Sequence, residues 1–256
     1  GYQRAKGNVE HTLERIPLIG RPVRDGIRKG KAVLKQILYN STIFEDLGFH
    51  YYGPFDGHDL PQLLEVLENT KSIPKPVLLH VITSKGKGYP FAERHPGTFH
   101  GVSGFDIETG QAPPSGKSFS DVFGETLCKL ARSDPRICAI TAAMQLGTGL
   151  TGFRQEFSNR FYDVGIAEEH AVTFAGGLSS QGMIPVFAVY STFLQRAFDQ
   201  VIHDAALQRL KVVLAVDRAG IVGEDGETHQ GIFDVPFLNS VPGTVVYAPS
   251  FYEELE

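Results

Sequence analysis

Two adjacent carboxylates, Glu168 and Glu169, lie where a short strand predicted over residues 162–166 gives way to a helix of small residues. A carboxylate at such a half-buried junction is costly unless the fold supplies a partner for it. The first turn of a helix also tolerates negative charge, so simple helix capping is the alternative interpretation. Successive helix residues point about 100° apart. A site role for Glu168 would therefore leave Glu169 solvated or structural, and helix capping stays the alternative for the pair.

Two aromatic side chains, Tyr190 and Phe193, lie at the end of the strand predicted over residues 184–190. Open α/β sheets bind ligands at the carboxyl ends of their strands. A flat aromatic ring there can stack on a planar ligand, which contributes about 0.5–1.5 kcal/mol beyond buried area, and a tyrosine hydroxyl can reach a substrate hydroxyl or phosphate. The alternative for both residues is packing in the core.

A second polar group follows the next predicted strand. Arg218 stands directly after that strand, and a guanidinium suits a phosphate because its planar fork bonds two oxygens at once. A salt bridge to Asp217 or Asp225 is the alternative. The glycine-rich loop at residues 220–231 carries Asp225 and His229, and a histidine that titrates near neutrality can shuttle protons. A solvated loop histidine is the alternative for His229.

Arg196 and Asp199 lie three residues apart on a helix predicted over residues 193–208. Side chains at this spacing are neighbours on a helix surface. We expect an exposed ion pair between them and place neither in the site.

The elements that must position these residues alternate between strand and helix. Strands are predicted at residues 48–53, 76–83, 137–142, 161–164, 184–190, 212–217 and 244–247, and helices at 58–71, 119–131, 168–181 and 193–208. Asp59 is well placed to cap the first helix, and the unbroken apolar run at 76–83 predicts a strand buried on both faces. The alternation predicts an α/β fold with doubly wound, mostly parallel sheets in two pieces.

Bulk properties exclude several classes of protein. The 256 residues are 42% hydrophobic and 21% charged, with a net charge of −5, so there is no basic footprint for nucleic acid or an anionic membrane. The apolar runs are too short to span a bilayer. The two cysteines have no zinc or disulfide-scaffold spacing, which indicates a reducing compartment, and no other residues group as a metal site.

The chain resembles the 1-deoxy-D-xylulose-5-phosphate synthases, a family of thiamine-diphosphate enzymes related to transketolase. The resemblance covers nearly the whole chain and is carried by residues 163–170 (DVGIAEEH), 189–200 (VYSTFLQRAFDQ), 217–234 (DRAGIVGEDGETHQGIFD), 53–59 (GPFDGHD), 85–89 (KGKGY) and 99–100 (FH). It implies a thiamine-diphosphate-binding fold. It also implies a homodimer in the cytoplasm, or in the plastid if the source is a plant or alga.

The resemblance implies a role for each candidate residue. Glu168 occupies the position of the family's glutamate, which bonds N1′ of the cofactor's aminopyrimidine so that the cofactor's own imino group can remove the C2 proton of the thiazolium. Phe193 stacks on the aminopyrimidine. The other implied roles are binding of the phosphorylated acceptor by Arg218 and Tyr190, proton transfer and orientation by Asp225, His229 and His100, and contacts to the diphosphate and the cofactor body by Lys85 and Tyr89.

The implied reaction decarboxylates pyruvate and joins the two-carbon fragment to D-glyceraldehyde 3-phosphate. The products are CO₂ and 1-deoxy-D-xylulose 5-phosphate, and the latter is a precursor for non-mevalonate isoprenoid, thiamine and pyridoxal synthesis. The alternatives are a transketolase-like ketol transfer and a non-catalytic α/β remnant. The amino-acid sequences of residues 217–223 and of the loop with Asp225 and His229 favour the synthase over transketolase.

Two features depart from the family pattern. Family members are more than twice as long, and they carry a Gly-Asp-Gly motif with a downstream asparagine that holds Mg²⁺ and the diphosphate; that motif does not occur here. We expect residues 1–101 to be the C-terminal part of the diphosphate-binding domain, 102–117 a linker and 118–256 the pyrimidine-binding domain, without the third, C-terminal domain. The Mg²⁺ ligands are expected upstream, so the chain alone is predicted to bind no cofactor tightly and to be inactive.

Overall fold

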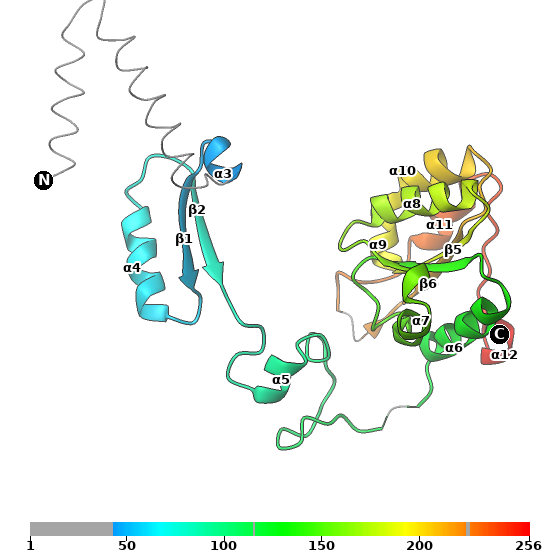
Figure 1. Cartoon of the computed structure of the whole chain (residues 1–256), viewed down its shortest axis with the longest axis horizontal. Helices are drawn as coiled ribbons and strands as arrows, with labels where there is room; N and C mark the ends of the chain where they lie inside the picture. The colour runs from blue at the N-terminus through cyan, green and yellow to red at the C-terminus, as the bar shows by residue number, and fades with distance from the viewer. Residues whose placement is uncertain (1–42, 115, 224–225) are drawn as a thin grey trace, which may run out of the picture. The chain divides into compact units, whose positions relative to one another are not determined.

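The computed structural model of the chain describes residues 43–114, 116–223 and 226–256. The chain divides into two units, Gly1–Pro96 and Gly97–Glu256, each described here by itself. Figure 1 shows the elements of both units, with labels along the chain.

The described part of the first unit is a parallel βαβ unit. Its elements are α3 (Ile43–Asp46), β1 (His50–Asp56), α4 (Leu60–Thr70), β2 (Val77–Ile82) and α5 (Pro90–Arg94). Strands β1 and β2 pair in parallel, with a register shift between Tyr52 and Phe55. The carboxylate of Asp59 accepts a hydrogen bond from the Gln62 N–H at 3.1 Å, which confirms the predicted cap.

The second unit is built on a four-stranded parallel sheet in the order β4-β3-β5-β6. Its strands are β3 (Ile137–Thr141), β4 (Phe161–Asp163), β5 (Ile184–Tyr190) and β6 (Val213–Asp217). The register places Thr141 opposite Asp163 and Ala188, and Tyr190 opposite Asp217, so the carboxyl ends of all four strands reach one edge. This order confirms the predicted doubly wound α/β fold.

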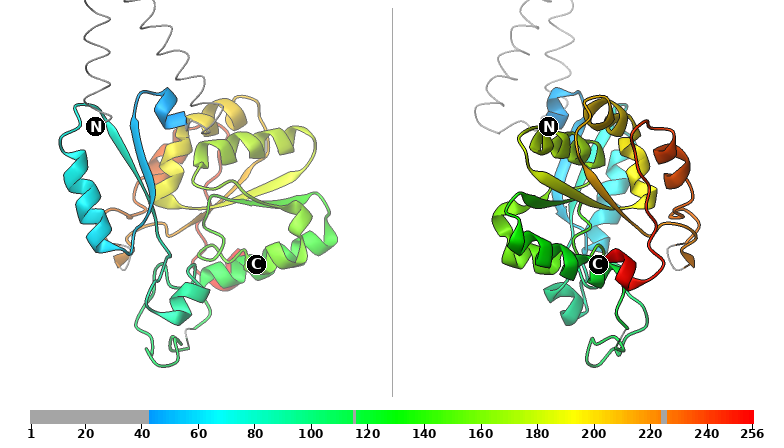
Figure 2. Two further views of the ribbon diagram at one scale, coloured as in Figure 1. Left: turned by 60° about the vertical axis from the view of Figure 1, so that its left-hand side comes forward. Right: turned by 90° about the vertical axis from the view of Figure 1, so that its right-hand side faces the viewer.

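Helices cover both faces of this sheet, as Figures 1 and 2 show. They are α6 (Phe119–Ser133), α7 (Thr151–Glu156), η1 (Ser158–Arg160), α8 (Glu168–Ser180), α9 (Ser191–Leu194), η2 (Gln195–Ala197), α10 (Phe198–Gln200), η3 (Val201–Ala206), α11 (Asp234–Asn239) and α12 (Tyr252–Leu255). α6 begins with a capping box between Ser118 and Asp121. The C-terminal helix α12 lies beside α6, where Tyr252 packs edge-on against Phe119 and donates to the Lys117 carbonyl at 2.6 Å.

Alternate residues of the central strands supply two separate cores. Phe187 and Val189 of β5 pack in a cluster with the buried side of α8, whereas Val186 and Ala188 pack in a second cluster with α6 and α7. Successive strand residues point to opposite faces, so a strand covered on both faces must be apolar throughout. The run at 184–190 meets that requirement, and it forms β5 with the predicted bounds.

Three predicted elements are wrong in part. The helix predicted over 193–208 is instead broken into α9, the 3₁₀ turn η2, α10 and the π-helix η3. The prediction missed these breaks because an apolar residue at about every fourth position is compatible with several helical hydrogen-bond patterns. No strand forms at 244–247 in the described part of the chain, and Val245 is 89% exposed there. Strand β2 is half-buried rather than buried on both faces, and it pairs only with β1 among the described residues.

In the described residues, no helix is both long and apolar enough to cross a bilayer. Both cysteines are free and buried in the second unit, Cys128 in α6 and Cys138 in β3. Burial raises the pKa of the Cys128 thiol, and it raises the pKa of Cys138 from 9.0 to about 11, because a low-dielectric interior disfavours the thiolate.

Native thiols are therefore expected to resist alkylation at pH 8, since the thiolate is the reactive form. Titration with a thiol reagent should detect both groups only after denaturation. Between pH 9 and 11 the unfolded chain ionises at Cys138 while the native chain does not, so the free energy of unfolding should fall with rising pH over that window. Rapid reaction of either thiol in the native chain would contradict this burial.

Candidate active site at the carboxyl edge of the second sheet

The site lies where the strand order of the second sheet reverses. From β3 the chain passes outward to β4, then returns across β3 to β5 and continues to β6. The connections after β3 and β5 therefore leave their strands in opposite directions and open a crevice at the carboxyl edge, which is the usual ligand site of such sheets. The Asp163 carboxylate fixes one wall, because it accepts from the N–H groups of Ala143 at 2.9 Å and Gly165 at 3.0 Å.

Glu168 is the first residue of α8 and is only 1% exposed. Its two carboxylate oxygens lie 2.9 and 3.0 Å from Nη1 of Arg196. Arg196, 28 residues later in the chain, is thus the partner that this buried carboxylate requires. Glu169, the next residue of the helix, is exposed, as the angle between successive helix residues predicts.

This contact corrects the predicted surface pair of Arg196 and Asp199. Arg196 pairs with Glu168, and the Asp199 carboxylate lies 3.6 Å from Nε2 of His203. The prediction counted only neighbours along one helix, whereas Arg196 reaches across to another helix. Arg196 is the main residue of the site that the sequence interpretation missed.

A row of planar side chains extends from this ion pair. The Arg196 guanidinium carbon lies 5.0 Å from the ring centroid of Phe193. The Tyr190 ring lies nearly parallel to Phe193, at 6.1 Å and 22°, and the Arg218 guanidinium carbon lies 4.1 Å from the Tyr190 centroid. His229 meets Phe193 edge-on at 5.4 Å and 84°. The structure therefore brings together most of the predicted residues of this unit.

The loop that carries His229 is held by its own side chains. Gly220 and Gly231 form an antiparallel bridge that closes the loop. The Gln230 amide donates to the carbonyls of Val222 at 3.0 Å and Gly226 at 2.7 Å, and its oxygen accepts from the Val222 N–H at 2.8 Å. Nδ1 of His229 lies 2.8 Å from the Thr228 hydroxyl. Asp225, a predicted member of the site, lies outside the described residues.

Arg218 has a strained backbone at the end of β6. Its φ is +54°, in the left-handed region that non-glycine residues rarely adopt. Its N–H donates to Oδ1 of Asp217 at 2.7 Å, and Oδ2 of Asp217 accepts from the Ser120 hydroxyl at 2.7 Å. Strain of this kind persists only where the surrounding structure fixes it, and it clusters at functional sites.

The remaining predicted residues lie elsewhere in the chain. Lys85 and Tyr89 belong to the first unit, where Lys85 is exposed and Tyr89 precedes α5 as its N-cap. His100 is exposed in the second unit, and its N–H donates to the Gly97 carbonyl at 3.3 Å. Within residues 43–114, 116–223 and 226–256, no three His, Cys, Asp or Glu side chains group as a metal site.

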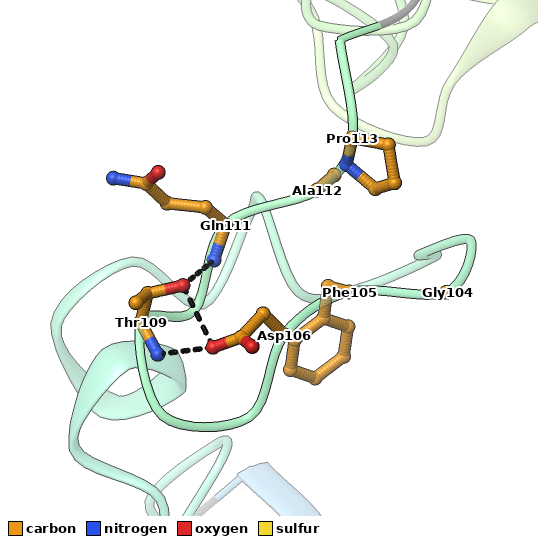
Figure 3. Close-up of a pocket in the computed structure, with 7 residues that line it drawn as sticks. All are labelled: Gly104, Phe105, Asp106, Thr109, Gln111, Ala112 and Pro113. Atoms are coloured by element: carbon orange, nitrogen blue, oxygen red, sulfur yellow. Dashed lines mark hydrogen bonds between the residues drawn. The ribbon is translucent and has the colours of Figure 1, made fainter.

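One pocket lies apart from this row of side chains, in the segment predicted as a linker. Figure 3 shows its wall, which is formed by Gly104, Phe105, Asp106, Thr109, Gln111, Ala112 and Pro113. The Asp106 carboxylate accepts from the Thr109 N–H at 2.8 Å and hydroxyl at 2.9 Å, and these bonds lower the pKa of Asp106. The carboxylate therefore stabilises its own turn, and none of the predicted site residues lines this pocket.

Comparison with known proteins gives consistent matches along the chain. A family model described as the pyrimidine-binding domain of transketolase matches residues 115–256, and one described as 1-deoxy-D-xylulose-5-phosphate synthase matches residues 1–83. A 1-deoxy-D-xylulose-5-phosphate synthase of Symbiobacterium thermophilum is 54% identical over 100% of this chain and 39% of its own length, and one of Natranaerobius thermophilus is 53% identical over 100% and 41%.

The chain thus spans about two fifths of the length of the curated relatives that it matches. Among solved structures, a split-gene transketolase in the form of an inactive β4 tetramer is 29% identical, with a TM-score of 0.44 over 50% of this chain and 41% of that one.

The position of Tyr190 gives a direct test of the site's packing. A Cβ atom on Gly147 would lie 1.6 Å from the Tyr190 hydroxyl oxygen. Gly147→Ala should therefore expel the tyrosine ring and lower the free energy of unfolding by about 1–3 kcal/mol, the usual cost of overpacking. Chemical denaturation measures that loss, and a crystal structure of the variant locates the ring.

Gly177→Ala is the matched control, because Gly177 is an exposed helical residue with open space around its Cβ position. That change should leave the chain as stable, or raise the free energy of unfolding by about 0.5–1 kcal/mol. Equal effects from the two substitutions would contradict the close contact between Gly147 and Tyr190.

Proposed function

We propose, on the premise that this chain belongs to the 1-deoxy-D-xylulose-5-phosphate synthase family, that its second unit holds the aminopyrimidine end of thiamine diphosphate and the phosphorylated acceptor. The observation that carries the proposal is the buried Glu168 carboxylate at the strand-order reversal, which is joined to the Phe193 ring through the Arg196 guanidinium. The family relationship suggests the cofactor, and this arrangement of side chains supports the assignment of its ring to this edge.

The chemistry of these side chains fits such a ring. A flat heterocycle with a protonated ring nitrogen needs a buried carboxylate as acceptor and an aromatic face for stacking, and Glu168 and Phe193 offer both. Both groups also contact the guanidinium of Arg196. When bound, thiamine diphosphate supplies the acidic carbon of its thiazolium. The part of Glu168 is to hold a proton at the pyrimidine nitrogen in a site shielded from water.

We assign the phosphorylated acceptor to the other end of the row. Arg218 offers a guanidinium fork for the phosphate of D-glyceraldehyde 3-phosphate, and Tyr190 a hydroxyl. We propose that His229 holds or moves a proton at a substrate oxygen; its Nδ1 lies within hydrogen-bonding distance of the Thr228 hydroxyl, and its ring packs edge-on against Phe193. Asp225 and His100 are proposed to orient the same substrate. The overall reaction is then decarboxylation of pyruvate and transfer of the two-carbon fragment to the aldehyde.

The domain assignment is part of the proposal. We assign residues 118–256 to the pyrimidine-binding domain, 102–117 to a linker and 1–101 to the end of the diphosphate-binding domain, with Lys85 and Tyr89 near the diphosphate and cofactor body. Mg²⁺ and the diphosphate would be held by a Gly-Asp-Gly segment outside this sequence. A homodimer working in the cytoplasm, or in a plastid, completes the family picture.

The 256-residue chain alone is expected to show no tight binding of the cofactor, because the Gly-Asp-Gly segment that holds Mg²⁺ and the diphosphate in the family does not occur in its sequence. Titration calorimetry with Mg²⁺ and thiamine diphosphate measures this directly, and binding at micromolar concentration would contradict it.

The control is a chimera in which residues 1–256 replace the matching stretch of the Symbiobacterium thermophilum relative, which supplies the rest of the enzyme. The chimera should bind the cofactor and form 1-deoxy-D-xylulose 5-phosphate. Failure of a well-folded chimera to do either would favour the alternative, a non-catalytic module.

Glu168→Ala in the chimera should slow exchange of the cofactor's C2 proton by orders of magnitude, because the pyrimidine nitrogen loses its acceptor. Exchange is followed by NMR in D₂O, and circular dichroism checks that the variant is folded. Glu169→Ala is the matched control, since that carboxylate is exposed, and it should leave exchange unchanged. The opposite pattern would move the role to Glu169.

A further inference from the structure

Glu168 needs a counter-charge that its own helix does not provide. The carboxylate side chain is 2% exposed, and Ala167, the residue at the N-cap of α8, offers no side-chain hydrogen bond. Burial of an unpaired carboxylate is strongly unfavourable, whereas a paired one is tolerated when its lone pairs are also satisfied. The ion pair with Arg196 is therefore required for Glu168 to be buried at this position.

The geometry of the pair leaves Glu168 able to bind a second partner. A single nitrogen of Arg196, Nη1, lies 2.9 and 3.0 Å from the two oxygens. A carboxylate has about four acceptor positions. One bridging nitrogen therefore leaves acceptor positions on both oxygens for a ligand, so that the arginine does not have to leave when a ring nitrogen arrives.

The same guanidinium is also fixed against the aromatic ring. Phe193 lies in α9 and Arg196 lies in the 3₁₀ turn η2, which begins after Leu194. Side chains three residues apart are neighbours on a helical surface. The Arg196 guanidinium carbon accordingly lies 5.0 Å from the Phe193 centroid, so the cation is held over the ring.

We propose that Arg196 is the positioning residue of this site, which holds the Glu168 carboxylate and the Phe193 ring in one fixed arrangement. One side chain contacts both groups, so the distance between the acceptor and the stacking face depends on it. Its role toward the cofactor rests on the proposed function, while its role in fixing Glu168 does not. Arg196→Lys keeps the charge without the planar group, and Arg196→Met keeps length without charge.

A double-substitution cycle in the 256-residue chain tests the coupling. Arg196→Met should lower the midpoint of thermal unfolding by several degrees, because it strands a buried carboxylate. Combining it with Glu168→Gln should cost clearly less than the sum of the single changes, since no charge remains to be paired. Additive effects would overturn the proposal.

The matched control is the exposed pair of Arg132 and Glu156, joined by bonds of 2.7 and 2.6 Å, whose side chains are 59% and 39% exposed. The same substitutions there, Arg132→Met and Glu156→Gln, should be close to additive because water screens the pair. Coupling of equal size at both pairs would mean that the buried site has no special dependence on its arginine, and would overturn the proposal.

Exchange of the cofactor's C2 proton in the chimera separates positioning from simple stabilisation. Arg196→Met should slow exchange at least tenfold although Glu168 is present, and Arg196→Lys should fall between this variant and the unsubstituted protein. Normal exchange in a folded, cofactor-bound Arg196→Met chimera would overturn the positioning role and leave the proposed function intact. If Glu168→Ala also exchanges normally, the proposed function itself fails.

Discussion

Burial of one carboxylate is the constraint on which the arrangement of the site depends. Glu168 begins α8 after the short turn that follows β4, the shortest strand of the sheet, and its oxygens are closed off from solvent. Such a charge can stay only if a cation lies within hydrogen-bonding distance. The cation comes from the connection after β5, so the ion pair links the segments that follow β4 and β5.

Sheet topology explains why these segments meet although they are far apart in sequence. Parallel pairing in register brings Tyr190 opposite Asp217, and hence Phe193 and Arg218 to the same edge. The reversal of strand order then opens the connections after β3 and β5 in opposite directions. Into this crevice the fold directs planar and cationic side chains, each in contact with the next, rather than the aliphatic groups that fill both faces of the sheet.

Periodicity and strand-end positions predicted the fold class and β5 to the residue, whereas the choice of Glu168, Phe193, Tyr190, Arg218 and His229 as site residues also rested on the family resemblance. What sequence patterns did not reveal were contacts between distant segments. Asp199 lies three residues from Arg196 and so looks like its ion-pair partner, and the sequence spacing does not indicate that Arg196 pairs with Glu168 instead. The 3₁₀ and π turns after Phe193 were missed for a related reason, because the apolar residues repeat at a spacing that several helical forms share. Val245 and its neighbours have strand-like residues but no strand beside them in the described chain.

The side chains around Glu168 are held in place by contacts within one unit of the chain. Every contact that joins Glu168, Arg196, Phe193, Tyr190 and Arg218 is made within the second unit, whose sheet has a core on each face. Such a framework fixes side chains before a ligand binds, which removes the cost of ordering them later. The positions of these side chains are therefore fixed by the second unit itself. Within that framework Arg196 keeps the buried charge of Glu168 stable, because it is the cation that the carboxylate contacts.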